Sequence, residues 1–190
     1  EINLATIYIS KMNLILNGFA KDIPNIQFGD TLIDPKHHEG NNIMKFDCVV
    51  SDPPIRVKNW GYNELLNDRY GRFHRGLPSK SIGDYAFITH LVESIKENGV
   101  GAVLISNGVL FRGGPEGKIR ENFIKENIIH CVISLPSNML YSTSIPITLL
   151  IFKKNRGTNE VLFIDASNSE KKSSKVNTVL SEEDIDRIYK

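Results

Sequence analysis

One ten-residue run, Phe46 to Ile55, constrains the fold more than any other part of the chain, and it reads Phe-Asp-Cys-Val-Val-Ser-Asp-Pro-Pro-Ile. Its first five residues are apolar or β-branched enough to form a buried strand. The two prolines cannot continue a ladder, because proline has no backbone N–H to donate. The strand therefore ends at Ser51 or Asp52. We expect Asp52 at the carboxyl edge of a sheet, where open α/β sheets bind their ligands.

Asp52 and Pro53 would form a compact pair of hydrogen-bond acceptors at this edge. A primary amine could donate one hydrogen to the Asp52 side chain and one to the Pro53 carbonyl, which orients its lone pair for attack on an electrophilic methyl group. The motif thus favours methyl transfer to an exocyclic amino group. The alternative is a strand that ends in a proline-braced turn, and the tripeptide alone does not decide between the two.

Helical and strand patterns alternate along the chain, which predicts a parallel sheet with helices on its faces. Helical patterns cover residues 4–16, 84–98 and 115–126, and Ser181 with Asp184 forms a capping box for a terminal helix. Strand patterns cover residues 26–28, 46–50, 102–106, 128–134, 147–153 and 161–164. Too few residues separate 128–134 from 147–153 for a helical crossover, so these two strands are expected to pair antiparallel.

The chain has 190 residues, 41% of them hydrophobic, which is enough for one sizeable core and a single domain. Its formal net charge is +1, so a surface for nucleic acid must be local. No segment has the apolar length of a membrane span, and no membrane partner is expected. Cys48 and Cys131 are expected to be buried free thiols in a reducing cytoplasm.

Three motifs follow one another from residue 84 onward: DYAFITH at 84–90, NGVLFRGG at 107–114 with Glu116 and Arg120, and LPSNMLYSTSIP at 135–146. In this order they resemble the modification subunit of type I restriction-modification systems, the N6-adenine DNA methyltransferases, over nearly the whole chain. The resemblance implies an α/β, Rossmann-like fold that uses S-adenosylmethionine, with a mostly parallel sheet and a reversed last strand. It also implies methyl transfer to adenine N6 in DNA.

The family has a glycine-rich cofactor turn upstream of a helix like residues 3–17, and this chain has no such turn. Residues 1–165 are therefore expected to form a partial catalytic domain without its amino-terminal part. Residues 166–190 are expected to be a polar linker with a terminal helix.

The resemblance also implies which residues hold the cofactor. Glu1 matches the family's ribose-binding acid, and Asp30 matches the acceptor for the amino group of the cofactor's adenine. Asp84 and Phe87 open a helix that faces the active edge. The alternatives are a frayed terminal residue for Glu1, a turn aspartate for Asp30 and a helix N-cap for Asp84.

The catalytic motif departs from the family's commonest form, which begins with asparagine and ends with an aromatic residue. Here it reads Asp52-Pro53-Pro54-Ile55. Aspartate keeps the acceptor role, but isoleucine cannot stack on a flipped base, a contact worth roughly 1–3 kcal/mol when an aromatic makes it. Candidates for the missing aromatic face, each of which could also be a core or loop anchor, are Trp60, Tyr62, Phe111 and Tyr141.

The stretch 55–83 is too long for an ordinary connection, and it carries six basic against two acidic residues, interleaved with aromatics. Such a mixture suits phosphate contacts and base stacking. A solvated loop packed by its own aromatics is the alternative. The residues expected to contact DNA are Arg56, Lys58, Trp60, Arg72, Arg75 and, from a later motif, Phe111.

The resemblance implies DNA, a specificity subunit and a restriction subunit as partners, with two copies of the chain per assembly. No metal site is expected from the histidine and cysteine spacing. Two alternatives remain open. The same proline motif occurs in methyltransferases that act on RNA or protein glutamine, although the GVLFRGG and YSTSIP segments count against them. A truncated or variant copy could instead assemble or bind DNA without activity, which Ile55 and the absent glycine turn favour.

Overall fold

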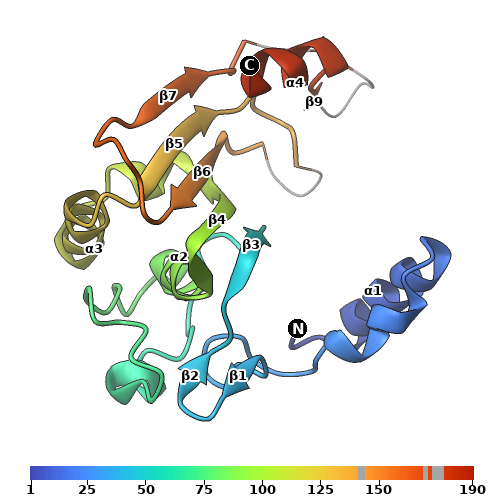
Figure 1. The fold of residues 1–190 in the computed structure, drawn as a ribbon, viewed down its shortest axis with the longest axis vertical. Helices are drawn as coiled ribbons and strands as arrows, with labels where there is room; N and C mark the ends of the chain where they lie inside the picture. The colour runs from blue at the N-terminus through green and yellow to red at the C-terminus, as the bar shows by residue number, and fades with distance from the viewer. Residues whose placement is uncertain (141–143, 169–170, 173–177) are drawn as a thin grey trace. The chain divides into compact units, whose positions relative to one another are not determined.

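The structure is a computed structural model that describes residues 1–140, 144–168, 171–172 and 178–190. The chain forms two compact units. The first contains residues 1–44 and 61–71, and the second contains residues 45–60 and 72–190. Figure 1 follows the chain through its helices and strands.

The first unit begins with helix α1, Leu4–Leu16, as the sequence pattern predicts. The Asn3 side chain caps it by accepting from the backbone N–H of Ala5 at 2.9 Å. Gly18 ends it with a φ of +81°, a conformation that glycine adopts without steric cost. The rest of the unit contains the 3₁₀ helices η1, Ala20–Asn25, and η2, Glu64–Asn67, and the antiparallel hairpin of β1, His38–Glu39, with β2, Asn42–Ile43.

The strand expected at residues 26–28 does not form. These residues leave η1 in an irregular conformation, and the Phe28 side chain is 53% exposed. Three residues without a partner strand cannot satisfy their backbone groups as a ladder would, so local apolar character is not enough to make a strand here.

The second unit contains a five-stranded sheet with the strand order β3-β4-β6-β5-β7. The strands are β3, Phe46–Ser51, β4, Ile95–Ser106, β5, Ile129–Ser134, β6, Ile147–Lys153, and β7, Leu162–Asp165. β3 and β4 are parallel, as are β5 and β7, whereas β6 runs antiparallel to both of its neighbours. The expected antiparallel pairing of β5 and β6 is therefore confirmed, and Figure 1 shows these strands next to one another.

Helix α2, Asp84–Glu93, is shorter than predicted. The backbone N–H and hydroxyl of Ser94 both donate to the His90 carbonyl, which closes the helix. Ile95 then joins β4 and is fully buried. Gly99 lies against the backbone of β3, where an added Cβ would be 2.9 Å from the Asp47 carbonyl oxygen. Residues 95–98, which the sequence pattern assigns to the helix, therefore belong to strand β4. Helix α3, Gly114–Lys125, has Pro115 in its first turn and matches its prediction.

The sheet has an apolar cluster on each face, because successive residues of a strand point to opposite sides. One cluster joins α2 and α3 to the sheet and includes Ile88, Val103 and Phe123. The other contains Cys131, Ile133, Leu135, Ile147 and Ala166, with Leu180 and Ile188 packed against it.

The terminal helix α4, Glu182–Tyr189, begins at the predicted capping box of Ser181 and Asp184. A short pair of strands, β8, Lys171–Lys172, and β9, Thr178–Val179, precedes it. Residues 169–170 and 173–177 of the expected linker lie outside the described residues, and a domain boundary after residue 165 stays a prediction.

Strand β3 is an edge strand of the sheet, and it is less buried than its sequence predicts. Its Val50 side chain is 76% exposed, and Cys48 is exposed whereas Cys131 is buried. The expectation of two buried thiols is therefore wrong for Cys48. No helix of the described residues is long and apolar enough to cross a membrane.

Candidate active site

The acceptor motif lies where the sequence places it, directly after the last residue of β3, Ser51. Ser51 pairs with Val103, and β4 continues to Ser106, so the motif sits at the carboxyl edge of the two parallel strands. Asp52 and Pro54 are exposed, and Pro53 and Ile55 are half-buried. The carboxylate of Asp52 is therefore presented to solvent at the edge where α/β folds bind ligands.

The backbone of the motif is held by the start of α2. Arg56, which follows Ile55, has a φ of +56°. Residues other than glycine rarely adopt this left-handed backbone conformation. Its backbone N–H donates to Asp84 Oδ1 at 2.6 Å. Asp84 is only 6% exposed and lies in the first turn of α2, and the N-cap is Gly83. The N-cap alternative for Asp84 is therefore wrong.

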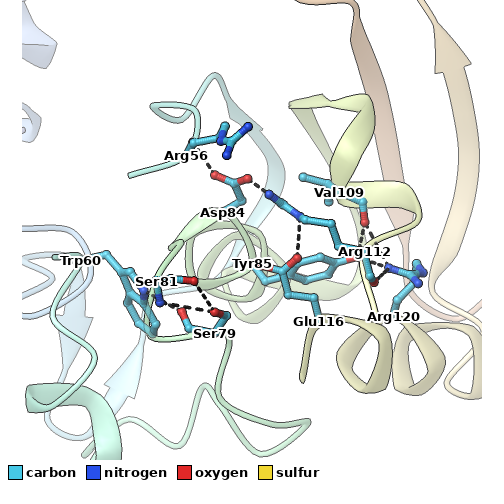
Figure 2. A network of polar contacts seen from close by, with 10 residues as sticks. All are labelled: Arg56, Trp60, Ser79, Ser81, Asp84, Tyr85, Val109, Arg112, Glu116 and Arg120. Atoms are coloured by element: carbon cyan, nitrogen blue, oxygen red, sulfur yellow. Dashed lines mark hydrogen bonds and ion pairs between the residues drawn. The ribbon is translucent and has the colours of Figure 1, made fainter. Parts of the chain in front are cut away.

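The second oxygen of Asp84 joins a chain of ion pairs, drawn in Figure 2. Arg112 Nη2 donates to Asp84 Oδ2 at 2.5 Å, and Arg112 Nε lies 2.6 Å from Glu116 Oε2. Burial raises the pKa of Glu116, and Asp84 adds to this effect while Arg112 opposes it. The Arg112 guanidinium group thus joins Asp84, at the start of α2, to Glu116 of α3.

A second set of bonds fixes the segment that carries Arg112. The Tyr85 hydroxyl donates to the Val109 carbonyl at 2.9 Å, and Arg120 Nη1 donates to the carbonyls of Val109 and Arg112 at 3.2 and 3.0 Å (Figure 2). Burial raises the pKa of Tyr85, which favours the protonated hydroxyl as donor. Phe111 lies within this braced segment, after the 3₁₀ helix η3, Asn107–Leu110, and is 75% exposed.

Arg112, Glu116 and Arg120 belong to one of the sequence motifs, but their positions alone do not indicate a role. The spacing of Arg112 and Glu116, four residues apart, is the one local signal of their pairing. Their contacts with Asp84 and Tyr85 join residues 28 and 35 positions apart, which spacing cannot reveal.

The expected DNA-contacting residues divide into two groups. Arg56, Lys58 and Phe111 are exposed. In contrast, Trp60 is 3% exposed and its indole N–H donates to the Ser79 carbonyl, and Arg72 is 0% exposed.

Arg75 belongs with the buried group, because it is 8% exposed and forms ion pairs with Glu93 and Glu126. Burial alone would raise the pKa of Glu93, but the hydrogen bond and charge of Arg75 outweigh it and lower that pKa. Trp60, Arg72 and Arg75 are therefore buried in the second unit, which does not favour contact with DNA, and such contact stays a prediction. Trp60 bonds within the 55–83 segment, as the alternative of a loop packed by its own aromatics expects, whereas Arg75 bonds to Glu93 and Glu126 outside the segment.

The two cofactor candidates in the first unit, Glu1 and Asp30, form hydrogen bonds with other residues of that unit. Glu1 Oε1 accepts from the Asn3 N–H at 2.8 Å, and the Glu1 backbone nitrogen donates to the Gln27 carbonyl at 3.2 Å. Asp30 Oδ1 accepts from the N–H groups of Leu32 and Ile33, as a turn aspartate does.

Phe87 is half-buried in α2 of the second unit. Within that unit, the structure brings Asp84 together with the residues after β3, as described above. Tyr141, a candidate for the missing aromatic face, lies outside the described residues.

Two cavities lie at the carboxyl edge. One of about 10 Å³, lined by Pro53, Ile55, Asp84 and others, has room for about one water molecule and none for a base. The other, of about 650 Å³, lies at the ends of β5 and β7 and mixes polar with apolar side chains. Its volume is in the range of small-molecule sites. No cluster of three or more His, Cys, Asp or Glu side chains among the described residues could hold a metal ion.

The family model for N-6 DNA Methylase matches residues 1–190, the whole of the chain. The chain belongs to the N-6 DNA methylase family. The resemblance seen in its motifs is thereby confirmed.

Two relatives with similar sequences are methylase subunits of type I restriction enzymes. The type I restriction enzyme MjaVIII methylase subunit of Methanocaldococcus jannaschii is 34% identical over 201 residues, which cover 100% of this chain and 34% of that protein. The MpnII methylase subunit of Mycoplasma pneumoniae is 34% identical over 196 residues, covering 99% of this chain and 36% of that protein. The chain therefore spans about a third of the length of these relatives.

A solved structure shows the same fold. The type I restriction-modification system methyltransferase subunit from Streptococcus thermophilus superimposes with a TM-score of 0.86 and 37% identity, covering 100% of this chain and 40% of that one. The chain thus has the α/β fold of the methyltransferases, with β6 as its reversed strand.

Proposed function

We propose that this chain forms part of an N6-adenine DNA methyltransferase, the modification subunit of a type I restriction-modification system. The observation that carries the proposal is the Asp52-Pro53-Pro54 motif, with Asp52 exposed, at the carboxyl edge of β3 in a chain that belongs to the N-6 DNA methylase family. The carboxylate and the proline carbonyl are acceptors for the two hydrogens of an exocyclic amine.

In this mechanism Asp52 and the Pro53 carbonyl hold adenine N6 so that its lone pair points at the methyl donor. S-adenosylmethionine, when bound, supplies an electrophilic methyl group on sulfur. With the cofactor bound, Asp52 and the Pro53 carbonyl would hold N6 for direct displacement of the methyl group from sulfur, after which N6 would lose a proton to solvent. This route would need no metal and no covalent enzyme intermediate. The chain's contribution is orientation of the amine, which is worth several orders of magnitude in rate.

Cofactor contacts are proposed for Glu1 and Asp30. Both turn hydrogen bonds of Asp30 go to Oδ1, and Oδ2 would be the acceptor for an adenine amino group. Glu1 would accept from ribose hydroxyls in the same way. Phe87 would offer apolar contact from α2.

Asp84 fits a cofactor role less well than the sequence suggests. Each of its carboxylate oxygens already accepts a hydrogen bond from the protein, one from the Arg56 backbone and one from Arg112. A cofactor hydroxyl or amine would have to share these oxygens inside a site where Asp84 is 6% exposed.

DNA contacts are proposed for the exposed residues of the expected set. Arg56 and Lys58 directly follow the acceptor motif, so their charges suit the phosphates beside a flipped base. Phe111 is an exposed aromatic on a segment braced by Tyr85 and Arg120, and it could stack on a base in place of Ile55.

Partners are proposed from the relatives, which are methylase subunits of type I restriction enzymes. This chain would act in the cytoplasm with a specificity subunit that selects the DNA sequence, a restriction subunit and a second copy of itself. A variant module that binds DNA or assembles without activity is the alternative, and Ile55 in the catalytic motif favours it.

The deciding experiment is transfer of labelled methyl from S-adenosylmethionine to adenine-containing DNA by the complete protein with its specificity partner. Label in adenine N6 that disappears with Asp52→Ala supports the enzyme. Absence of label with intact DNA binding would support the inactive module. Label in RNA or protein glutamine would move the assignment to another substrate class.

A further inference from the structure

The residue that ends the acceptor motif has an unusual backbone. Arg56 is in the left-handed region although it carries a side chain, and it directly follows Ile55. Such a conformation persists where surrounding contacts hold it in place. The contact observed here is the 2.6 Å hydrogen bond from the Arg56 N–H to Asp84 Oδ1.

Asp84 is itself firmly anchored. It is 6% exposed, and its second oxygen accepts from Arg112, whose guanidinium also pairs with Glu116 of α3. The backbone carbonyl of Arg112 in turn accepts from Arg120. The buried acceptor for the Arg56 N–H is therefore tied to two helices rather than to a mobile side chain.

We propose that Asp84 is a positioning residue, which holds Asp52 and the Pro53 carbonyl in place by fixing the backbone turn at Arg56. This inference rests on the proposed methyltransferase function and gives Asp84 a different role within it from that of a cofactor ligand. Asp84 acts through the backbone and contacts neither the amine nor the methyl donor. Pro53 and Pro54 transmit the constraint, since their rings fix φ on the other side of Ile55.

The two roles predict different kinetics. A positioning residue governs how well the amine is aligned, so its loss lowers kcat and leaves cofactor affinity unchanged. A cofactor ligand governs binding, so its loss raises the Kd for S-adenosylmethionine. The variants are Asp84→Ala, which removes the acceptor, and Asp84→Asn, which keeps the shape and one amide oxygen that can accept from Arg56 N–H.

Glu126→Ala is the matched control. It removes a carboxylate that pairs with Arg75, so it also breaks an arginine ion pair of this unit, but one with no bond to the acceptor motif. All variants are measured in the complete protein with its DNA-recognition partner. Circular dichroism and thermal melting establish that each is folded.

We expect Asp84→Ala to lower kcat by about 100-fold, the effect of a displacement near 1 Å in a reacting group. The Kd for S-adenosylmethionine should stay within about threefold, a change near 0.6 kcal/mol. Asp84→Asn should recover at least about tenfold of the lost kcat through the retained acceptor. Glu126→Ala should change neither quantity.

An unchanged kcat in Asp84→Ala would overturn the inference, as would a loss of cofactor affinity that accounts for the whole defect. Hydrogen exchange of the Arg56 amide provides a readout that needs no activity. The amide should exchange faster in Asp84→Ala than in the wild type and the Glu126→Ala control, and unchanged protection would also overturn the inference. If the wild type transfers no methyl group, the proposed function fails, while the exchange result still decides whether Asp84 fixes the turn.

Discussion

The backbone N–H of Arg56 and the Oδ1 atom of Asp84 lie 2.6 Å apart, and this hydrogen bond joins the end of the acceptor motif to the beginning of α2. The two residues are 28 positions apart in the sequence. The bond explains how an exposed edge segment can keep a defined shape. Asp52 and Pro53 would contact the substrate, whereas Arg56 and Asp84 would support them through this hydrogen bond.

Replacement of Asp52 should remove activity without unfolding the protein. Asp52 is exposed, so Asp52→Ala should change the free energy of unfolding by less than about 0.5 kcal/mol while methyl transfer is lost. Asp52→Asn keeps an acceptor oxygen and should retain measurable transfer. Paired methyl-transfer and urea-unfolding measurements test this, and normal turnover by Asp52→Ala would refute the acceptor role.

An aromatic residue at position 55 should raise the affinity for DNA by stacking on a flipped base. Stacking is worth about 1–3 kcal/mol per base, so Ile55→Tyr should strengthen binding of DNA with an unpaired target adenine by about tenfold. Ile55→Leu, which changes shape without adding a ring, is the control. Equal affinities in the two variants would mean that no base reaches this position.

Phe111→Ala should weaken the same interaction, since Phe111 is the exposed aromatic of the braced segment. We expect a loss of about 1–3 kcal/mol in affinity for single-stranded DNA, with Phe111→Tyr close to the wild type. Fluorescence titration measures both. If Phe111→Ala binds as well as the wild type, Phe111 does not stack on DNA.

Lys58 and Arg72 should give opposite results although both are basic. Lys58 is exposed, so Lys58→Ala should reduce the salt dependence of DNA binding by about one phosphate contact and leave stability unchanged. Arg72 is fully buried, so Arg72→Ala should lower the free energy of unfolding. The salt dependence of DNA binding by the folded variant should stay as in the wild type. A weaker salt dependence of DNA binding in Arg72→Ala would show that Arg72 contacts DNA.

Glu93 should make stability depend on acidity. The Arg75 hydrogen bond and charge hold the folded pKa of Glu93 below its ordinary value of 4.5. The contribution of Glu93 to stability is therefore fully present above pH 4.5 and is lost as pH falls through the folded pKa. The wild type should therefore lose more stability than Glu93→Gln between about pH 5 and pH 3. Urea unfolding at several pH values tests this, and parallel curves would contradict the ion pair with Arg75.

Local sequence signals predicted the parts of the fold that depend on local chemistry. The prolines end β3 at Ser51, and the short connection makes β5 and β6 antiparallel. The capping box at Ser181 opens α4. In each case one nearby feature restricts the backbone, so no distant partner is needed to interpret it.

Predictions failed where distant partners decide the outcome. The apolar pattern through Ile95 fits a helix as well as a strand, and pairing with Phe46 selects the strand. The basic residues of the 55–83 segment have the composition of a DNA surface, but Glu93 and Glu126 draw Arg75 into the protein. Composition gives the charge of a side chain and not its direction.

The unequal exposure of the two cysteines provides a built-in attachment point for a reporter group. Cys48 is exposed on β3, whereas Cys131 is buried and its pKa is raised by that burial. A maleimide dye should therefore label Cys48 selectively without any engineered residue. Because Cys48 lies four positions before Asp52, the dye's emission would register whatever covers this end of β3, from DNA to a second protein chain.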